Sequence, residues 1–192
     1  IGGRYVCALS PDGKLLGLVV DDFLPLIISL PDGQVVARLD GHRGTINSLE
    51  FNSDRSRVVT TSWDATVRLW DTRSGALLST LEGHGDSTVF AAFSDDGSWV
   101  ASIGRDKSAR IWNSATGAEQ LQIDCGARTG HGAFSPDSRY FAVPSGVGSV
   151  EIWDVTLKSK SCTIAGYGIP ASRVCFSPAG TRLAILTEDG GI

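Results

Sequence analysis

The chain has 192 residues, a formal net charge of −4, and 42% hydrophobic and 20% charged residues, which excludes the disordered and low-complexity classes. The mild acidity argues against a nucleic-acid surface built from clustered basic residues. The longest apolar stretch, 15–30, is interrupted by Asp21, Asp22 and Pro25. A membrane span needs about 20 mostly apolar residues, so we expect none in this chain.

An internal repeat runs along the whole chain. Its leading apolar residues are spaced 42, 42, 41 and 42 residues apart and are Leu9, Phe51, Phe93, Phe134 and Phe176. Three tryptophans keep the same step at Trp70, Trp112 and Trp153, and four aspartates follow a leading residue by 13 positions at Asp22, Asp64, Asp106 and Asp189. Three anchors in step indicate a repeat architecture.

Each repeat has the pattern of an antiparallel β-meander. In the second unit, alternating or β-branched segments at 45–51, 57–61, 66–71 and 76–81 are separated by turn-rich residues. Four short strands joined by turns are typical of one four-stranded antiparallel sheet. Both faces of the strands are apolar, as at Val58 and Val59, which indicates that neighbouring sheets stack face to face.

The repeat resembles the WD-repeat family of β-propellers, through Gly41-His42, Gly83-His84, Trp70-Asp71, Trp112-Asn113 and Trp153-Asp154. The resemblance implies an all-β propeller of four-stranded antiparallel blades, with repeats at approximately 1–40, 41–82, 83–124, 125–165 and an incomplete 166–192. These amount to about four and a half repeats. Propellers of this family usually have seven blades, which at this period need roughly 290 residues. We therefore expect the chain to be part of a larger propeller, with the missing blades in the same parent chain.

Histidine, hydroxyl, aspartate and tryptophan recur together in the second and third units. The two sets are His42, Thr60, Asp64 and Trp70, and His84, Ser102, Asp106 and Trp112. An active site is rarely duplicated at a structural period, and the resemblance assigns both sets to a buried hydrogen-bond network. The network positions are lost in the other units: Leu18 and Ile28 in the first, Cys125, Val143 and Val147 in the fourth, Tyr167 and Ile185 in the fifth. We expect the second and third blades to be the most rigid.

The four cysteines form no Cys-x-x-Cys pair. Cys7 and Cys175 lie in apolar stretches, so we expect buried free thiols rather than metal ligands or disulfides. This indicates a reducing compartment, the cytoplasm or the nucleus. His131 is out of register with the other two histidines, and we expect it at the surface without a metal.

Phosphate-loop, serine-hydrolase and zinc-protease motifs are all missing from the sequence. We therefore expect no enzyme activity, cofactor or metal. A rigid propeller with loops on two faces favours a non-catalytic scaffold that binds partner proteins or peptides. Nucleic-acid and membrane partners are not expected.

The resemblance places partner contacts on the upper face, which is built by the loops before the inner strands and by the turns between the second and third strands. The candidate contacts are Arg43, Trp63, Arg105, Lys107, Arg128 and Tyr167. Tryptophan and arginine dominate interface energetics. The positive charges of Arg43, Arg105 and Lys107 near Trp63 suggest an acidic or phosphorylated ligand. The alternative is that Trp63 only packs over a neighbouring loop.

Two other functions stay open. Residues 58–73 end in Trp-Asp-x-Arg and resemble a box of propellers that act as substrate receptors on a cullin-ring ubiquitin ligase. Arg73 would then contact the ligase adaptor on the opposite face. Alternatively, the repeats form a sensor or regulatory region of a larger signalling NTPase, kinase or protease.

Overall fold

The computed structural model describes residues 6–126, 130–146, 148–166 and 168–187. Every regular element among them is a β-strand. The first sheet has strands β1 (Cys7–Leu9), β2 (Leu15–Val19), β3 (Pro25–Ser29) and β4 (Val35–Arg38). The second has β5 (Ile46–Phe51), β6 (Arg57–Ser62), β7 (Val67–Asp71) and β8 (Leu77–Leu81), and the third has β9 (Thr88–Phe93), β10 (Trp99–Gly104), β11 (Ser108–Asn113) and β12 (Glu119–Asp124).

The fourth sheet has β13 (Ala133–Phe134), β14 (Tyr140–Ser145), β15 (Ser149–Asp154) and β16 (Ser159–Ile164), and the fifth has β17 (Ala171–Phe176) and β18 (Leu183–Thr187). Each four-stranded sheet is a meander, in which every strand pairs antiparallel with the next along the chain. The chain is therefore all-β, with four four-stranded antiparallel sheets and a two-stranded one, as expected from the sequence.

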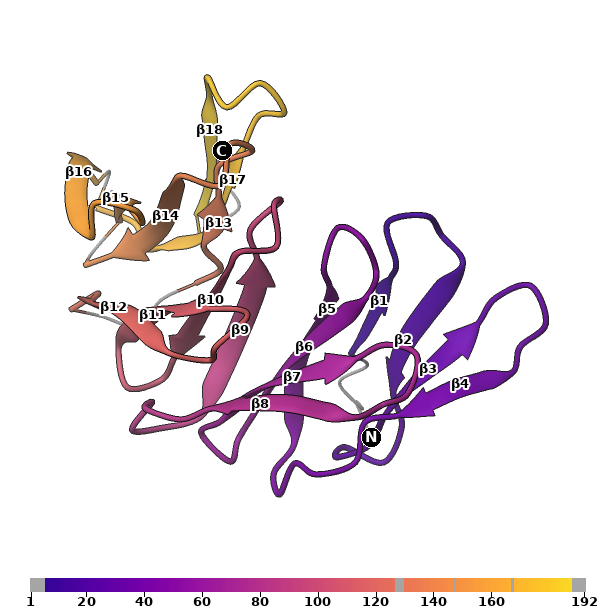
Figure 1. The fold of residues 1–192 in the computed structure, drawn as a ribbon. Helices are drawn as coiled ribbons and strands as arrows, with labels where there is room; N and C mark the ends of the chain where they lie inside the picture. The colour runs from indigo at the N-terminus through magenta and orange to yellow at the C-terminus, as the bar shows by residue number, and fades with distance from the viewer. Residues whose placement is uncertain (1–5, 127–129, 147, 167, 188–192) are drawn as a thin grey trace.

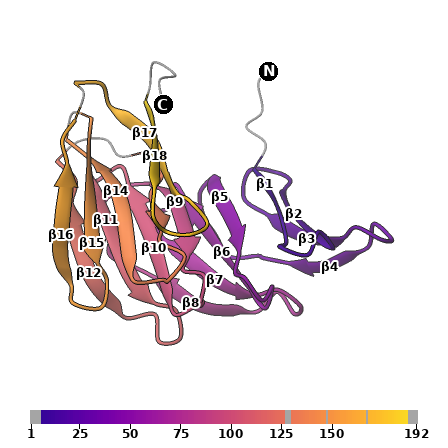
Figure 2. The ribbon, with the colours of Figure 1, turned by 90° about the horizontal axis from the view of Figure 1, so that it is seen from above.

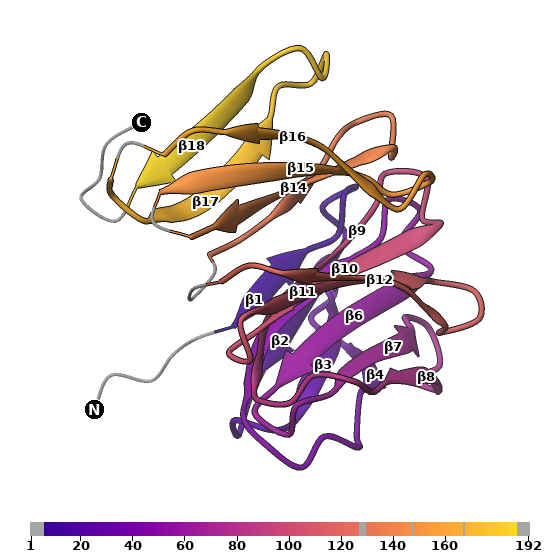
Figure 3. The ribbon, with the colours of Figure 1, turned by 90° about the vertical axis from the view of Figure 1, so that its left-hand side faces the viewer.

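The sheets follow one another along an arc (Figure 1). The first strands of the sheets, β1, β5, β9, β13 and β17, lie on the inner side, and the last strands, such as β8 and β12, lie on the outer side. Figures 2 and 3 show the same stacking from two other directions. The two edges of each sheet differ in their loops: the loop before the first strand shares one edge, called here the upper edge, with the turn between the second and third strands. The remaining two turns form the lower edge.

The second unit illustrates how the local pattern sets the strands. Its observed bounds differ from those expected by at most one residue at each end. Strands 3 and 4 of every complete sheet share a register shift, between Ile27 and Ile28, Leu69 and Trp70, Ile111 and Trp112, and Ile152 and Trp153. A bulge bends its strand and adds twist. The repeat therefore conserves this irregularity as well as the strands.

The apolar core lies between the sheets. Val58 packs in a cluster shared with the first sheet, and Val59 packs in a cluster shared with the third. Both are fully buried, because successive side chains of a strand point to opposite faces. Val58 and Val59 thus confirm the prediction that both faces of this strand are buried.

The burial expected for the cysteines is wrong for three of the four. Cys125 is buried, whereas Cys7, Cys162 and Cys175 are exposed, and all four are free thiols. Cys7 alternates with Ala8, which packs toward the second sheet, so the thiol faces the other way. Cys162 lies on the outer strand β16.

The residues that the structure describes contain no helix that could span a membrane.

Candidate functional site

The upper edge of the second sheet holds a chain of hydrogen bonds that begins in the core. The Trp70 indole Nε1 lies 2.8 Å from Thr60 Oγ1, and Thr60 Oγ1 lies 2.8 Å from His42 Nε2. His42 Nδ1 is in turn 2.8 Å from Asp64 Oδ2. The loop before β5, the strands β6 and β7 and the turn between them each supply one member. The network therefore fixes that loop and that turn against the sheet.

The chemistry of the groups sets the direction of each hydrogen bond. The indole N–H can only donate and the Asp64 carboxylate can only accept, so Thr60 accepts from Trp70 and donates its own hydroxyl proton to His42 Nε2. This leaves the His42 proton on Nδ1, from which it is donated to the Asp64 carboxylate. Trp70 and Thr60 are fully buried, so every polar group needs the partner that it has.

The third sheet repeats the arrangement. Trp112 Nε1 and His84 Nε2 both lie 2.8 Å from Ser102 Oγ, and His84 Nδ1 lies 3.0 Å from Asp106 Oδ2. The structure thus brings together each of the two sets that the sequence singled out. Duplication of the geometry, including the tilted contact of each histidine with its tryptophan, is characteristic of a repeated structural unit.

Two further members of the network were not identified from the sequence. Thr66 Oγ1 lies 2.6 Å from Asp64 Oδ1, and Ser108 Oγ lies 2.9 Å from Asp106 Oδ1. The backbone N–H of Arg43 also donates to Asp64 at 2.9 Å, as Gly85 does to Asp106. A hydroxyl two residues after each aspartate was the available signal.

The glycine before each histidine has a backbone conformation that favours glycine, and it packs tightly on the tryptophan. A Cβ at Gly41 would lie 3.2 Å from the Trp70 ring and 2.5 Å from Arg68 Nη1. Gly83 has the equivalent contact with Trp112 at 3.2 Å. Both glycines have positive φ, 154° and 157°, a region that residues with a side chain rarely adopt. The Gly-His pair therefore reflects close packing on the tryptophan.

In the fourth sheet, apolar packing replaces the network. Cys125 and Val143, at the histidine and hydroxyl positions, belong to one buried apolar cluster. Trp153 is half-buried, and its indole N–H donates instead to Glu151 Oε2 at 2.9 Å on the same strand. In the first sheet Asp22 is exposed. Val147, Tyr167 and Asp189 lie outside the described residues.

Burial and hydrogen bonding shift the pKa values of the histidine–aspartate pairs. Burial lowers the pKa of His42 and of His84 below the usual 6.5, and the neighbouring aspartates offset only part of that effect. Burial acts to raise the pKa of Asp64, but hydrogen bonds from Thr66, Arg43 N–H and His42 outweigh it and hold the pKa well below its usual value. At neutral pH the network therefore contains a neutral histidine and an ionised aspartate.

Acidification from pH 7.5 to 5.5 is expected to destabilise the fold through His42 and His84. In the unfolded chain a histidine takes up a proton near pH 6.5, whereas in the folded chain it does so only at lower pH. The contribution of each histidine to the free energy of unfolding is therefore complete above pH 6.5. It is lost as the pH falls toward the pKa of the folded state, by at most about 1.4 kcal/mol per pH unit for each histidine. Urea unfolding across this range measures the loss.

Glu50 on β5 opposes this trend, because burial raises the pKa of its carboxyl group to about 7. A carboxyl group with a raised pKa contributes stability below its unfolded value of 4.5 and loses it as pH rises through about 7. The Glu50→Gln variant removes the opposing contribution and should show a steeper acid loss than the wild type. A variant whose stability is unchanged between pH 7.5 and 5.5 would contradict the role given to the histidines.

Above the network, the turns of the second and third sheets present an aromatic–cation pair. Trp63 is 56% exposed, and Arg105 Cζ lies 5.8 Å from the centroid of its ring. Arg43 and Lys107 are exposed on the same edge. The structure thus brings Trp63 and Arg105 into contact, while Arg128 and Tyr167 lie outside the described residues.

The remaining candidates lie elsewhere. Arg73 is exposed after β7, on the lower edge. His131 is exposed and stacks on Phe90, with ring centroids 4.9 Å apart. Among the described residues no group of three or more His, Cys, Asp or Glu side chains has the geometry to hold a metal ion.

Comparison with known proteins identifies the repeat. The sequence model of the family described as "WD domain, G-beta repeat" matches residues 33–71 and 75–113, which include both Trp-centred networks. Human WD repeat-containing protein 36 is 32% identical over 72 residues, covering 38% of this chain and 8% of that protein. Periodic tryptophan protein 2 homolog of Schizosaccharomyces pombe is 38% identical over 76 residues, covering 38% of this chain and 9% of that protein.

A longer alignment joins the chain to the transcriptional corepressor LEUNIG_HOMOLOG of Arabidopsis thaliana. The two are 27% identical over 184 residues, which cover 95% of this chain and 23% of the corepressor. The chain thus spans less than a quarter of the length of each of these relatives, and none of the three bears the name of an enzyme. The residues that this model matches, 33–71 and 75–113, are therefore WD repeats, and the Gly-His anchors and four-stranded sheets of the chain agree with that assignment.

Proposed function

We propose that this chain is a non-catalytic platform for protein–protein interaction, and that Trp63 and Arg105 on its upper edge contact an acidic or phosphorylated segment of the partner. The observation that supports this most directly is the exposed Trp63 ring with a guanidinium beside it. A large aromatic ring left half in water is costly, and residues of this kind are concentrated at interface hot spots. The arginine supplies the charge that a carboxylate or phosphate would pair with.

The support beneath this pair is rigid. Asp64 follows Trp63 directly and is held by four donors in the network. The second and third sheets are also linked across their interface, because Ser62 N–H donates to Thr88 Oγ1 at 2.9 Å and the Thr88 hydroxyl lies 2.9 Å from the Thr66 carbonyl oxygen. Preorganised side chains lose less entropy on binding. This favours a recognition surface on these two sheets.

Trp63→Ala and Arg105→Glu are each expected to weaken partner binding by about tenfold or more, since truncating a hot-spot residue costs roughly 2 kcal/mol. Neither change should lower the melting temperature, because both side chains lie outside the core. The measurement is binding of the full-length protein to an array of acidic and phosphorylated peptides, followed by titration of the hits. Leu78→Ala, at a 51% exposed position on the outer strand β8, is the matched control. Binding that survives both changes would refute the proposal.

The family supports the platform function in general terms. A transcriptional corepressor is among the relatives, and we place this protein accordingly in the nucleus or the cytoplasm, with protein partners. The second candidate is the ligase-receptor function, which the exposed Arg73 on the lower edge favours. Under that function, Arg73→Ala would abolish co-purification of a cullin and Trp63→Ala would not. The regulatory function in a larger signalling enzyme depends on other domains of the parent chain.

A further inference from the structure

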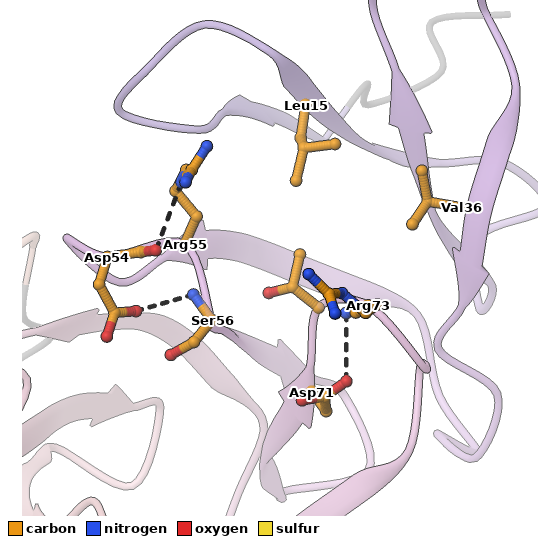
Figure 4. A pocket seen from close by; sticks show the side chains of 8 residues that line it. Leu15, Val36, Asp54, Arg55, Ser56, Asp71 and Arg73 are labelled. Carbon is orange, nitrogen blue, oxygen red and sulfur yellow. Dashed lines mark hydrogen bonds between the residues drawn. The ribbon is translucent and has the colours of Figure 1, made fainter.

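A pocket of about 490 Å³ opens on the lower edge, between the first and second sheets. Leu15 and Val36 line it from the first sheet, and Asp54, Arg55, Ser56, Asp71, Thr72 and Arg73 line it from the second (Figure 4). Its size is within the range of small-ligand sites. The pocket lies at the edge opposite the Trp63–Arg105 pair.

The equivalent place between the second and third sheets is a smaller pocket of about 310 Å³, lined by an arginine instead of an aliphatic residue. Arg57, the first residue of β6, corresponds to Leu15, the first residue of β2, and Ser114 after β11 corresponds to Thr72 after β7. Arg57 Nη1 donates to the Ser114 carbonyl oxygen at 3.1 Å and lies 3.4 Å from its hydroxyl. In this interface a polar side chain meets a polar side chain.

Between the third and fourth sheets both positions are apolar. Trp99, the first residue of β10, packs in the same cluster as the buried Val155, which follows β15. Among these three interfaces of the described residues, the first combines an aliphatic with a polar residue, because Leu15 lies where the second interface has a hydrogen-bond donor while Thr72 is polar. Thr72 is 3% exposed, and its hydroxyl oxygen has no hydrogen-bond partner among the described residues. A buried hydroxyl without a partner costs about 1–3 kcal/mol.

The charges around the pocket are partly paired: hydrogen bonds from Ser74 and, more weakly, the charge of Arg73 lower the pKa of the Asp71 carboxyl group. Asp54 accepts from Ser56 N–H at 2.8 Å, and Asp71 accepts from Ser74 N–H at 2.7 Å and from its hydroxyl at 2.6 Å. Arg55 forms an ion pair with Asp12. No ion pair involves Arg73 in the described part of the chain. The two aspartates therefore act as turn caps, and Arg73 is available to an anionic partner.

We propose that this pocket binds an extended segment of a partner protein in which an aliphatic side chain precedes a carboxylate. The aliphatic group would cover Leu15 and Val36, and the carboxylate would pair with Arg73. These two requirements match the apolar part and the cationic part of the lining. This site is separate from the upper edge and does not depend on the function proposed there.

Two peptides test the proposal, acetyl-Gly-Leu-Asp-Gly-amide and its neutral counterpart acetyl-Gly-Leu-Asn-Gly-amide, titrated against the full-length protein by ligand-observed saturation-transfer NMR. The Asp peptide should bind with a Kd on the order of 1 mM, and the Asn peptide about threefold more weakly, since an exposed ion pair contributes less than about 1 kcal/mol. Two variants complete the design. Leu15→Arg introduces the arginine that lines the next interface, and Arg73→Met removes a positive charge at an exposed position.

Leu15→Arg should abolish binding of both peptides while a cooperative thermal melt is retained. Arg73→Met should leave the two peptides with equal affinity, and this variant decides the question even if Leu15→Arg fails to fold. The proposal is overturned if the wild type binds neither peptide at 10-fold the expected Kd, if it binds both equally, or if Arg73→Met keeps the preference for the Asp peptide.

Discussion

Thr60→Val is expected to lower the free energy of unfolding by about 2–5 kcal/mol. The substitution keeps the shape of the side chain but removes the oxygen that accepts from Trp70 Nε1 and donates to His42 Nε2. Two polar groups are then left in the interior, and each buried group without a partner costs about 1–3 kcal/mol. Urea unfolding followed by tryptophan fluorescence measures the change.

The control is Thr80→Val on the outer strand β8 of the same sheet, where the threonine is half-buried. This change should stay within about 0.5 kcal/mol of the wild type. A double variant, Thr60→Val with Trp70→Phe, removes both ends of one hydrogen bond and should cost less than the sum of the single changes. Equal losses for Thr60→Val and Thr80→Val would show that the network does not stabilise the sheet.

Leu69→Ala is expected to destabilise the fold by about 2–5 kcal/mol, the range for large-to-small changes at packed sites. Leu69 is fully buried in the cluster between the second and third sheets. Its removal leaves a cavity that two rigid sheets cannot close. Calorimetry should record a lower melting temperature with a smaller unfolding enthalpy.

Leu77→Ala provides the matched comparison, because it is the same substitution in the same sheet. Leu77 lies on the outer strand and is 45% exposed, so we expect a loss below about 1 kcal/mol. The contrast tests whether the stability of this arc resides between the sheets. If both variants melted together, well below the wild type, this account of the core would be wrong.

The same position in the repeat is filled by two kinds of chemistry. In the second and third sheets, Thr60 and Ser102 link a histidine to a tryptophan. In the fourth, Val143 and Cys125 pack in an apolar cluster, the Cys125 thiol donates to the Ile123 carbonyl oxygen at 3.8 Å, and burial raises the pKa of that thiol to about 12. Neither arrangement leaves a described polar side chain at these positions without a partner, because a buried polar group without a partner costs free energy. The repeat thus tolerates loss of the histidine, hydroxyl and aspartate together, while the retained Trp153 donates to Glu151 instead.

Much of the fold could be predicted from the sequence because it depends on local patterns. Alternation in segments such as 66–71 and the turn residues between them determine strands and hairpins over short distances. The Trp70 and Trp112 sets could be predicted because the same residue types recur in the two units at one fixed spacing. The cysteines show where this reasoning fails: an apolar neighbourhood in sequence does not say which face of a strand is covered, and Cys7 and Cys175 are exposed.

By itself, then, the sequence determined the repeat, the strands and the residue types that the network needs. Only the tertiary structure determined which side chains of neighbouring repeats contact each other. The contact of Arg105 with Trp63, the hydrogen bond of Arg57 with Ser114 and the pocket beside Leu15 each join residues from different sheets. Their distances depend on how two sheets stack and twist, which no period along a single chain encodes. The surfaces proposed for binding arise from these differences between repeats.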